Sequence, residues 1–178
     1  MDKEFQAKAI TMESPLEKLL ISAHKPVIMQ FLDKHPESFK EAMQLALSDK
    51  HPYSWRAAWM MWGYIKKNDS RVKPYLPKII AALEIRPEGQ QRELLKILYL
   101  MDIKEDHEGK LFDHCVKIWF ALKKKPAVRM NALKVLIKIA ERHPELKDEV
   151  KLLTRKEYLE SLSPGVKHSI NKLIHEKL

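Results

Sequence analysis

Four segments of this sequence begin alike and return at nearly the same interval. Each opens with a polar residue and a proline, at Pro52, Pro87, Pro126 and Pro164, and the prolines are separated by 35, 39 and 38 residues. Proline suits the first turn of a helix, where its missing N–H removes no hydrogen bond. Each segment then continues with apolar residues at helical spacing. The repeat therefore predicts one helix after each proline.

A second helical segment lies between successive prolines. Residues 71–83, 107–124 and 145–162 all place apolar side chains at i, i+3 or i+4, and i+7. Each unit is thus a helical hairpin. Neither helix of such a pair can hide its apolar stripe alone, so neighbouring pairs are expected to stack.

We therefore predict an all-α fold, an α-solenoid of about four antiparallel helix pairs. A chain of 178 residues suits one domain, and its four glycines leave few of the tight turns that a β-rich chain needs. We expect a single helical-repeat domain over residues 1–178. Its predicted segments are a capping segment at 1–25 with a short helix from Pro15, helix pairs at 26–51, 52–86, 87–125 and 126–163, and a terminal capping helix at 164–178.

The segment "KPAVRMNALKVL" resembles the HEAT and armadillo repeat superfamily. It carries Pro126, then Val128-Arg129, then the small and apolar Ala132 and Leu136. "HPYSWRAAW" is a looser version with Trp-Arg in place of Val-Arg, and "RPEGQQREL" keeps the proline but lacks the arginine. The resemblance covers roughly residues 52–178, and weakly the pair at residues 24–50 before them. It implies architecture only, because the superfamily includes scaffolds, transport factors and a few nucleic-acid enzymes.

Three of the four tryptophans fall on one predicted helix. Trp55, Trp59 and Trp62 are spaced i, i+4 and i+7, and Ala58 and Ile65 share their face. Such a stripe favours packing in the core. The alternative is a stacking platform for a ligand, but such platforms usually carry basic residues among their aromatics, and only Arg56 interrupts this run. The sequence leaves open whether one indole N–H reaches a groove.

Positive charge is concentrated in the C-terminal third of the chain. The net charge is +9, and residues 115–178 hold 15 Lys and Arg against 7 Asp and Glu. Two ladders repeat a cation every fourth residue, although like charges at this spacing destabilise an isolated helix. The resemblance implies that second helices of successive pairs line one concave face, where Lys117, Lys124, Lys151 and Arg155 would form a basic groove. The predicted partner-binding residues are Lys117, Lys124, Lys134, Lys138, Arg142, Lys147, Lys151 and Arg155.

A basic surface predicts an acidic partner. We expect a non-enzymatic scaffold or adaptor that binds an acidic or extended protein segment, with nucleic acid bound through its backbone as the alternative. A solvated surface without a partner is the third interpretation. The sequence contains no G-x-x-x-x-G-K loop, G-x-G-x-x-G loop or G-x-S-x-G elbow. The oligomeric state is not predicted.

A more remote interpretation is an enzyme of similar architecture. Some DNA glycosylases that remove alkylated bases combine aromatics, basic residues and a catalytic carboxylate in one groove. The stretch "SWRAAWMMW" resembles a helix of that kind, but it contains no carboxylate.

The best candidate for metal binding is a short stretch rich in potential ligands, with Asp106, His107, Asp113, His114 and Cys115. Its two histidines are seven residues apart, whereas helical metal sites more often use i, i+4 spacing. We expect no metal and no cofactor. Cys115 belongs to an apolar stripe, which favours an inert buried thiol. The sequence begins without the apolar core of a signal peptide and has no bilayer-length apolar run, so we expect a cytoplasmic protein without membrane contact.

Overall fold

The computed structural model describes residues 13–178, and every regular element within that range is helical. Two short 3-10 turns, Lys73–Tyr75 and Pro144–Leu146, precede α5 and α9. The prediction of an all-α fold is confirmed. The helices are α1 (Pro15–Ser22), α2 (Lys25–Lys34), α3 (Ser38–Leu47), α4 (Tyr53–Tyr64), α5 (Leu76–Ile85), α6 (Glu88–Leu100), α7 (Glu105–Phe120), α8 (Pro126–Ala140), α9 (Lys147–Leu152), α10 (Lys156–Leu159) and α11 (Pro164–Lys177).

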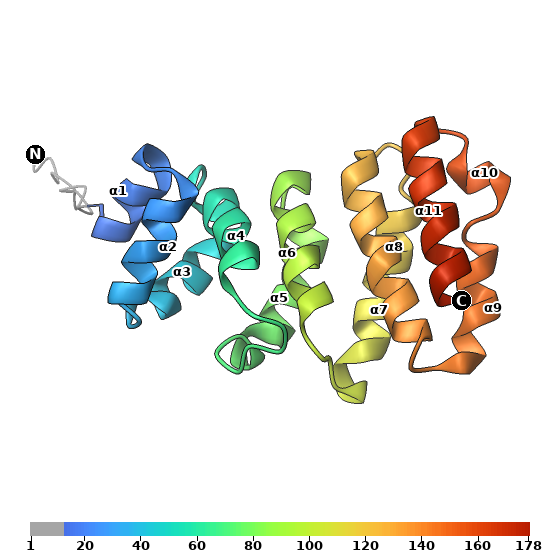
Figure 1. Ribbon diagram of the computed structural model, residues 1–178, viewed down its shortest axis with the longest axis horizontal. Helices are drawn as coiled ribbons and strands as arrows, with labels where there is room; N and C mark the ends of the chain where they lie inside the picture. The colour runs from blue at the N-terminus through green and yellow to red at the C-terminus, as the bar shows by residue number, and fades with distance from the viewer. Residues whose placement is uncertain (1–12) are drawn as a thin grey trace, which may run out of the picture.

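The helices form two stacked layers (Figure 1). In the first layer α4, α6, α8 and α11 lie side by side, and α1 and α2 contact α4 at the N-terminal end. In the second layer α3, α5 and α7 contact one another in the same order, and α9 packs on α8. Contacts are thus made between neighbours along the stack, which is the solenoid arrangement that the repeat predicts.

Two proline-started helices make their most extensive contacts with the helix before them in the chain, α4 with α3 and α8 with α7. The helix α6 also packs on α5, but it contacts α4 and α8 more extensively. The predicted division at the prolines instead grouped each such helix with the one after it, as in 52–86.

Local signals start the helices where the sequence predicts them. Ser14 caps α1: its hydroxyl accepts a bond from the Glu17 N–H at 3.0 Å, and its own N–H donates to the Glu17 carboxylate at 2.9 Å. The short helix from Pro15 is therefore confirmed, while residues 1–12 of the predicted capping segment lie outside the described residues. Pro126 and Pro164 begin α8 and α11.

The fourth residue of α4, α6 and α8 has the same role in each helix. Arg56 donates to the carbonyls of Leu20 and Ala23. Gln91 donates to the carbonyl of Leu83 at 2.8 Å. Arg129 donates to the carbonyl of Trp119 at 2.9 Å. Carbonyls near helix ends lack intrahelical donors, so these side chains satisfy them and hold adjacent helices together. This explains the Val-Arg pattern, and why an amide can replace the arginine in α6.

Candidate partner-binding surfaces

The tryptophans of α4 do not form its buried face. That face consists of small and flexible residues, since Ala57, Ala58, Met60 and Met61 are completely buried. Trp55, Trp59 and Trp62 are only partly buried, and the latter two pack on the edge of the core. The expectation that this stripe forms the core is therefore wrong for the three tryptophans, whereas Ala58 and Ile65, which share their face, are buried. The close approach of α3 and α6 to α4 selects the alanines for the inside and leaves the indoles outside.

The completely buried tryptophan is Trp119 on α7. Its indole N–H donates to the carbonyl of Leu153 at 2.8 Å. The Trp62 Nε1 atom is also buried, but it has no partner among the described residues.

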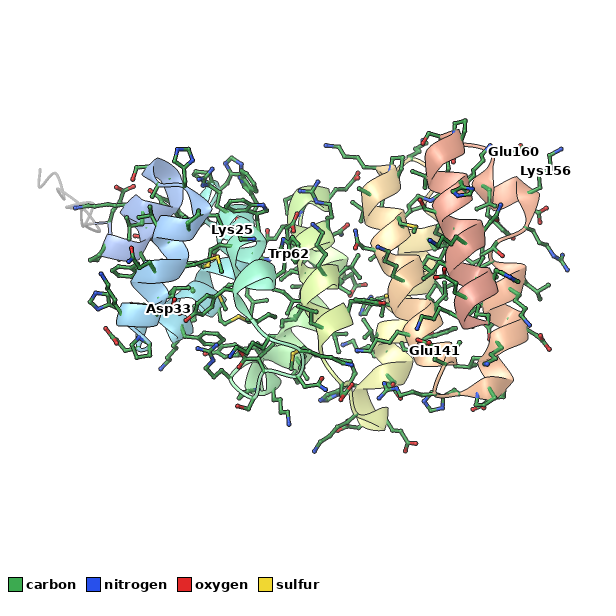
Figure 2. The ribbon with its side chains drawn as sticks, in the orientation of Figure 1. Lys25, Asp33, Trp62, Glu141, Lys156 and Glu160 are labelled. Carbon is green, nitrogen blue, oxygen red and sulfur yellow. The ribbon has the colours of Figure 1, made fainter. Side chains whose placement is uncertain are left out.

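Cations from three helices surround the α4 tryptophans. Lys25 of α2 places its Nζ 4.8 Å from the centre of the Trp59 ring and 4.7 Å from that of Trp62. Figure 2 labels Lys25 and Trp62, which lie near each other. The Nζ atom of Lys96, on α6, lies 4.4 Å from the centre of the Trp62 ring. Arg56 lies 5.6 Å from the centre of Trp55. We call Trp55, Trp59, Trp62, Lys25, Arg56 and Lys96 the aromatic face.

Sequence reasoning missed this grouping because Lys25 and Lys96 come from helices other than that of the tryptophans. Burial is the main cause that lowers the pKa of Lys25. The nearby Glu93 carboxylate opposes this shift, and the charge of Lys96 adds to it.

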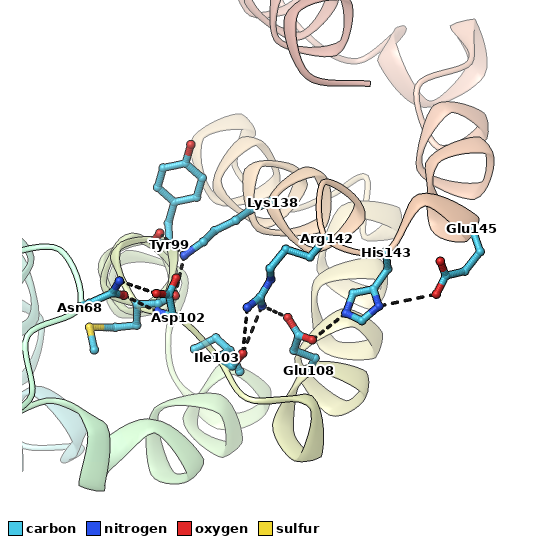
Figure 3. A network of polar contacts seen from close by, with 10 residues as sticks. Asn68, Tyr99, Asp102, Ile103, Glu108, Lys138, Arg142, His143 and Glu145 are labelled. Carbon is cyan, nitrogen blue, oxygen red and sulfur yellow. Dashed lines mark hydrogen bonds and ion pairs between the residues drawn. The ribbon is translucent and has the colours of Figure 1, made fainter.

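Two of the predicted partner-binding residues are used inside the protein (Figure 3). Lys138 donates to the carbonyls of Tyr99 and Met101 at 2.8 and 2.5 Å. Arg142 donates to the carbonyl of Ile103 at 3.2 Å and pairs with the buried Glu108 carboxylate. Both side chains therefore tie α8 to the end of α6 and to the connection that follows it.

The other ladder residues are less constrained. Lys151 makes a 3.6 Å ion pair with the exposed Asp148. Lys134, Lys147 and Arg155 make no side-chain hydrogen bond or ion pair with the described residues, and Arg155 is exposed. These cations remain available to an external anion.

Lys117 and Lys124 meet at a small cavity between α5 and α7, which we call the α5–α7 cavity. Its volume is about 180 Å³. Lys124 donates to the Gln91 amide oxygen at 2.9 Å, while Lys117 is exposed. The lining residues are Leu83, Glu84, Gln91, His114, Lys117, Ile118 and Lys124.

His114 brings an unpaired polar atom to this cavity. Its side chain is 7% exposed, and its Nε2 atom has no partner within residues 13–178. Burial lowers the pKa of His114, so the ring is neutral at pH 7. A neutral imidazole whose Nε2 carries the proton has one hydrogen bond to donate.

The candidate metal ligands on α7 do not form a cluster. Across the described part of the chain, no three His, Cys, Asp or Glu side chains are placed to hold a metal ion. Cys115 is completely buried, and burial raises its pKa far above the usual range, which confirms the expected inert thiol. None of the helices in residues 13–178 combines the length and apolar character of a bilayer span.

The stacked helix pairs and the buried arginine of the Val-Arg pattern agree with the family that the sequence matches. A family model described as HEAT repeat domain matches residues 12–177. The chain belongs to the HEAT repeat domain family. This match includes the pair at residues 24–50, where the resemblance is weak, and it extends to residue 12. No curated protein and no solved structure gave a significant match. HEAT repeat domains are helical scaffolds that typically mediate protein interactions and are typically non-catalytic.

Proposed function

We propose that this HEAT repeat protein is a non-enzymatic scaffold that binds an acidic, extended protein segment along its basic C-terminal third. The observation that carries the proposal is the α5–α7 cavity. There Lys117, Lys124 and His114, whose Nε2 atom is buried without a partner among the described residues, line a recess of about 180 Å³. The recess provides a specific anchor that a merely solvated basic surface lacks.

The chemistry of the cavity suits a carboxylate. A buried donor without a partner is unfavourable by about 1–3 kcal/mol, and an acceptor that fills the site recovers this energy. A carboxylate oxygen can accept bonds from the two lysine ammonium groups and from the His114 N–H. Glu84 is the acidic residue among those lining the cavity. It is exposed, and its charge, which also acts on His114, opposes the attraction of the two lysines for a carboxylate.

The rest of the basic surface would act less specifically. Lys147, Lys151 and Arg155 lie on and just after α9, where they can attract further acidic residues of an extended partner. Exposed charges act over about 10 Å at moderate salt and are screened beyond that distance. We therefore expect the cavity to set affinity and these cations to speed association. Lys138 and Arg142 are left out of the proposed surface because they bind inside the protein.

The test is binding of a fluorescein-labelled peptide rich in Glu, followed by fluorescence anisotropy at low and physiological salt. Changing Lys117→Glu and Lys124→Glu together should weaken binding at least about tenfold, because two attractive charges become repulsive. The matched control is Lys18→Glu with Lys34→Glu, which makes the same charge change on the exposed sides of α1 and α2. This control should retain most of the affinity.

A second variant separates the anchor from the overall charge. His114→Phe removes the N–H without changing the charge, and it should weaken peptide binding while circular dichroism stays native. The proposal fails if both double variants lose affinity equally, since binding would then follow net charge alone. It also fails if the protein binds unrelated DNA duplexes at low salt but not the peptide, which would favour backbone contacts to nucleic acid.

A further inference from the structure

The aromatic face exposes indole rings that α4 does not use to pack against its neighbouring helices. The layer interface of α4 is already filled by Ala57, Ala58, Met60 and Met61. Fully burying a large apolar side chain is worth about 1.5–3 kcal/mol, and three neighbouring tryptophans remain partly exposed. Apolar groups gathered at one place on a surface commonly mark a binding site.

Basic groups alternate with the indoles across the whole face. Lys25, Arg56 and Lys96 come from α2, α4 and α6 and lie between 4.4 and 6.0 Å from the ring centres. Gly63 permits this arrangement, because a Cβ at that position would collide with the end of the Lys25 side chain. The tertiary structure thus provides the interleaving of aromatic and basic groups that the tryptophan helix lacks by itself.

The face carries a surplus of positive charge. Its acidic neighbours are the exposed Asp49, which lies beside Trp55, and Glu93, which has no exposed area and is held by Arg92 at 2.6 Å and Lys96 at 3.0 Å. Two carboxylates therefore stand against Lys25, Arg56, Arg92 and Lys96. Because Glu93 cannot be reached from solvent, an approaching ligand does not meet that carboxylate.

A cavity lies at one end of the tryptophan row. It has a volume of about 330 Å³ and is lined by Trp55 together with Asp49, His51, Ser54 and Gln90. The Gln90 amide nitrogen is engaged with the carbonyls of Ala46 and Ser48 at 2.8 and 2.9 Å, which leaves its oxygen as an acceptor. One indole wall and several polar edges suit a flat ring that carries hydrogen-bonding groups on its rim.

We infer that the aromatic face binds single-stranded nucleic acid. Bases stack against Trp55 and Trp59, one base enters the cavity beside Trp55, and phosphates pair with Lys25 and Lys96. The Lys25 ammonium also donates to the Trp59 carbonyl at 3.3 Å, and Arg56 stays bound to the carbonyls of Leu20 and Ala23. Base stacking on aromatic side chains beside a basic track is tolerant of sequence. A duplex does not fit, because its bases are stacked on each other and cannot lie against the indoles. This surface is separate from the α5–α7 cavity, so each can fail without the other.

The experiment compares two labelled oligonucleotides of about 12 residues, an oligothymidylate and an abasic oligomer with the same number of phosphates. We expect the thymidylate to bind at least about tenfold more tightly and to quench tryptophan fluorescence. Trp55→Ala and Trp59→Ala should each weaken thymidylate binding about tenfold and leave binding of the abasic oligomer unchanged. Lys25→Met and Lys96→Met should weaken binding of both oligomers.

Phe120→Ala is the matched control, since it removes an exposed aromatic side chain from α7, away from this face. It should not change the affinity for thymidylate. Trp59→Phe, which keeps a flat ring, should restore most of the affinity lost in Trp59→Ala. Circular dichroism and thermal melts of each variant report whether the fold is intact.

Equal affinity for the two oligomers would overturn the inference, because binding would then depend on phosphates alone. Duplex DNA bound as tightly as the single strand would overturn it too. So would binding of the Glu-rich peptide that is lost in Trp59→Ala and kept in Lys117→Glu, since the face would then be a protein-docking surface.

Discussion

Arg129 shows why an arginine belongs in the middle of a packed repeat. It is 1% exposed, yet it donates to the carbonyls of Trp119 and Tyr158 and to the Ser161 hydroxyl. Burial lowers its pKa, but an arginine keeps its charge in proteins. The guanidinium replaces donors that the ends of α7 and α10 lack, and so joins three elements.

Replacing this residue should destabilise the fold. Arg129→Met leaves buried carbonyls without donors, and we expect the free energy of unfolding in urea to fall by about 2–4 kcal/mol. Arg155→Met is the control, because Arg155 is exposed and has no side-chain partner among the described residues. Its effect should stay within about 0.5 kcal/mol. Similar losses in the two variants would contradict this role.

His114 should make stability depend on pH. Burial, the largest cause, lowers its pKa, while Glu84 on α5 and Asp113 raise it and Lys110 and Lys117 lower it. The unfolded chain therefore takes up this proton at a higher pH than the folded protein. The stability contributed by the neutral ring is complete above about pH 6.5 and is lost as the pH falls below that value.

Urea titrations of the wild type and of His114→Asn at about pH 7 and pH 5 measure this effect. The variant should lose less stability between the two pH values than the wild type does. An identical loss in both proteins would show that His114 does not contribute.

At the scale of the helix, the contacts of α8 account for the charge ladder that includes Lys138 and Arg142. Lys138 and Arg142 cross from α8 to main-chain carbonyls in the region of residues 99–103. Cations are favoured near the C-terminal end of a helix, where carbonyls are unpaired. The spacing that weakens an isolated helix thus serves the contact between α8 and α6. Burial lowers the pKa of Lys138, which is consistent with a lysine that is drawn out of water.

The helix itself provides a matched pair of lysines for a test. Lys138→Met removes donors from two carbonyls, so we expect unfolding to become easier by about 1–2 kcal/mol. Lys134→Met, one turn earlier, removes the same charge without breaking a side-chain contact in the described structure, and should change stability by less than about 0.5 kcal/mol. Chemical denaturation of both variants checks this. Equal effects would mean that charge repulsion, and not capping, governs α8.

At the scale of the whole molecule, each helix depends on its neighbours in the stack. The last helix, α11, contacts α8 and buries Ile170 completely. In such an arrangement stability is close to a sum of unit and interface contributions. A defect at one end should therefore remain local.

Ile170→Ala tests this local behaviour. We expect a loss of about 2–4 kcal/mol at this interface. Amide hydrogen exchange should accelerate in α8 and α11 and stay unchanged in α3 and α4. Uniform acceleration along the chain would show instead that the protein unfolds as one cooperative unit.

The stacked helical fold follows from local information: helical period, proline at helix starts, the Ser14 cap and the Val-Arg pattern all act within a few residues. The surfaces do not follow from it. In α4 both the alanine and methionine stripe and the tryptophan stripe satisfy helical spacing, and only the approach of α3 and α6 places one of them inside. Likewise, the sequence predicts that Lys138 is a surface cation, but the fold brings it within hydrogen-bonding distance of carbonyls more than 35 residues earlier. Contacts between distant segments depend on how whole helices pack, and a local sequence pattern does not determine that packing.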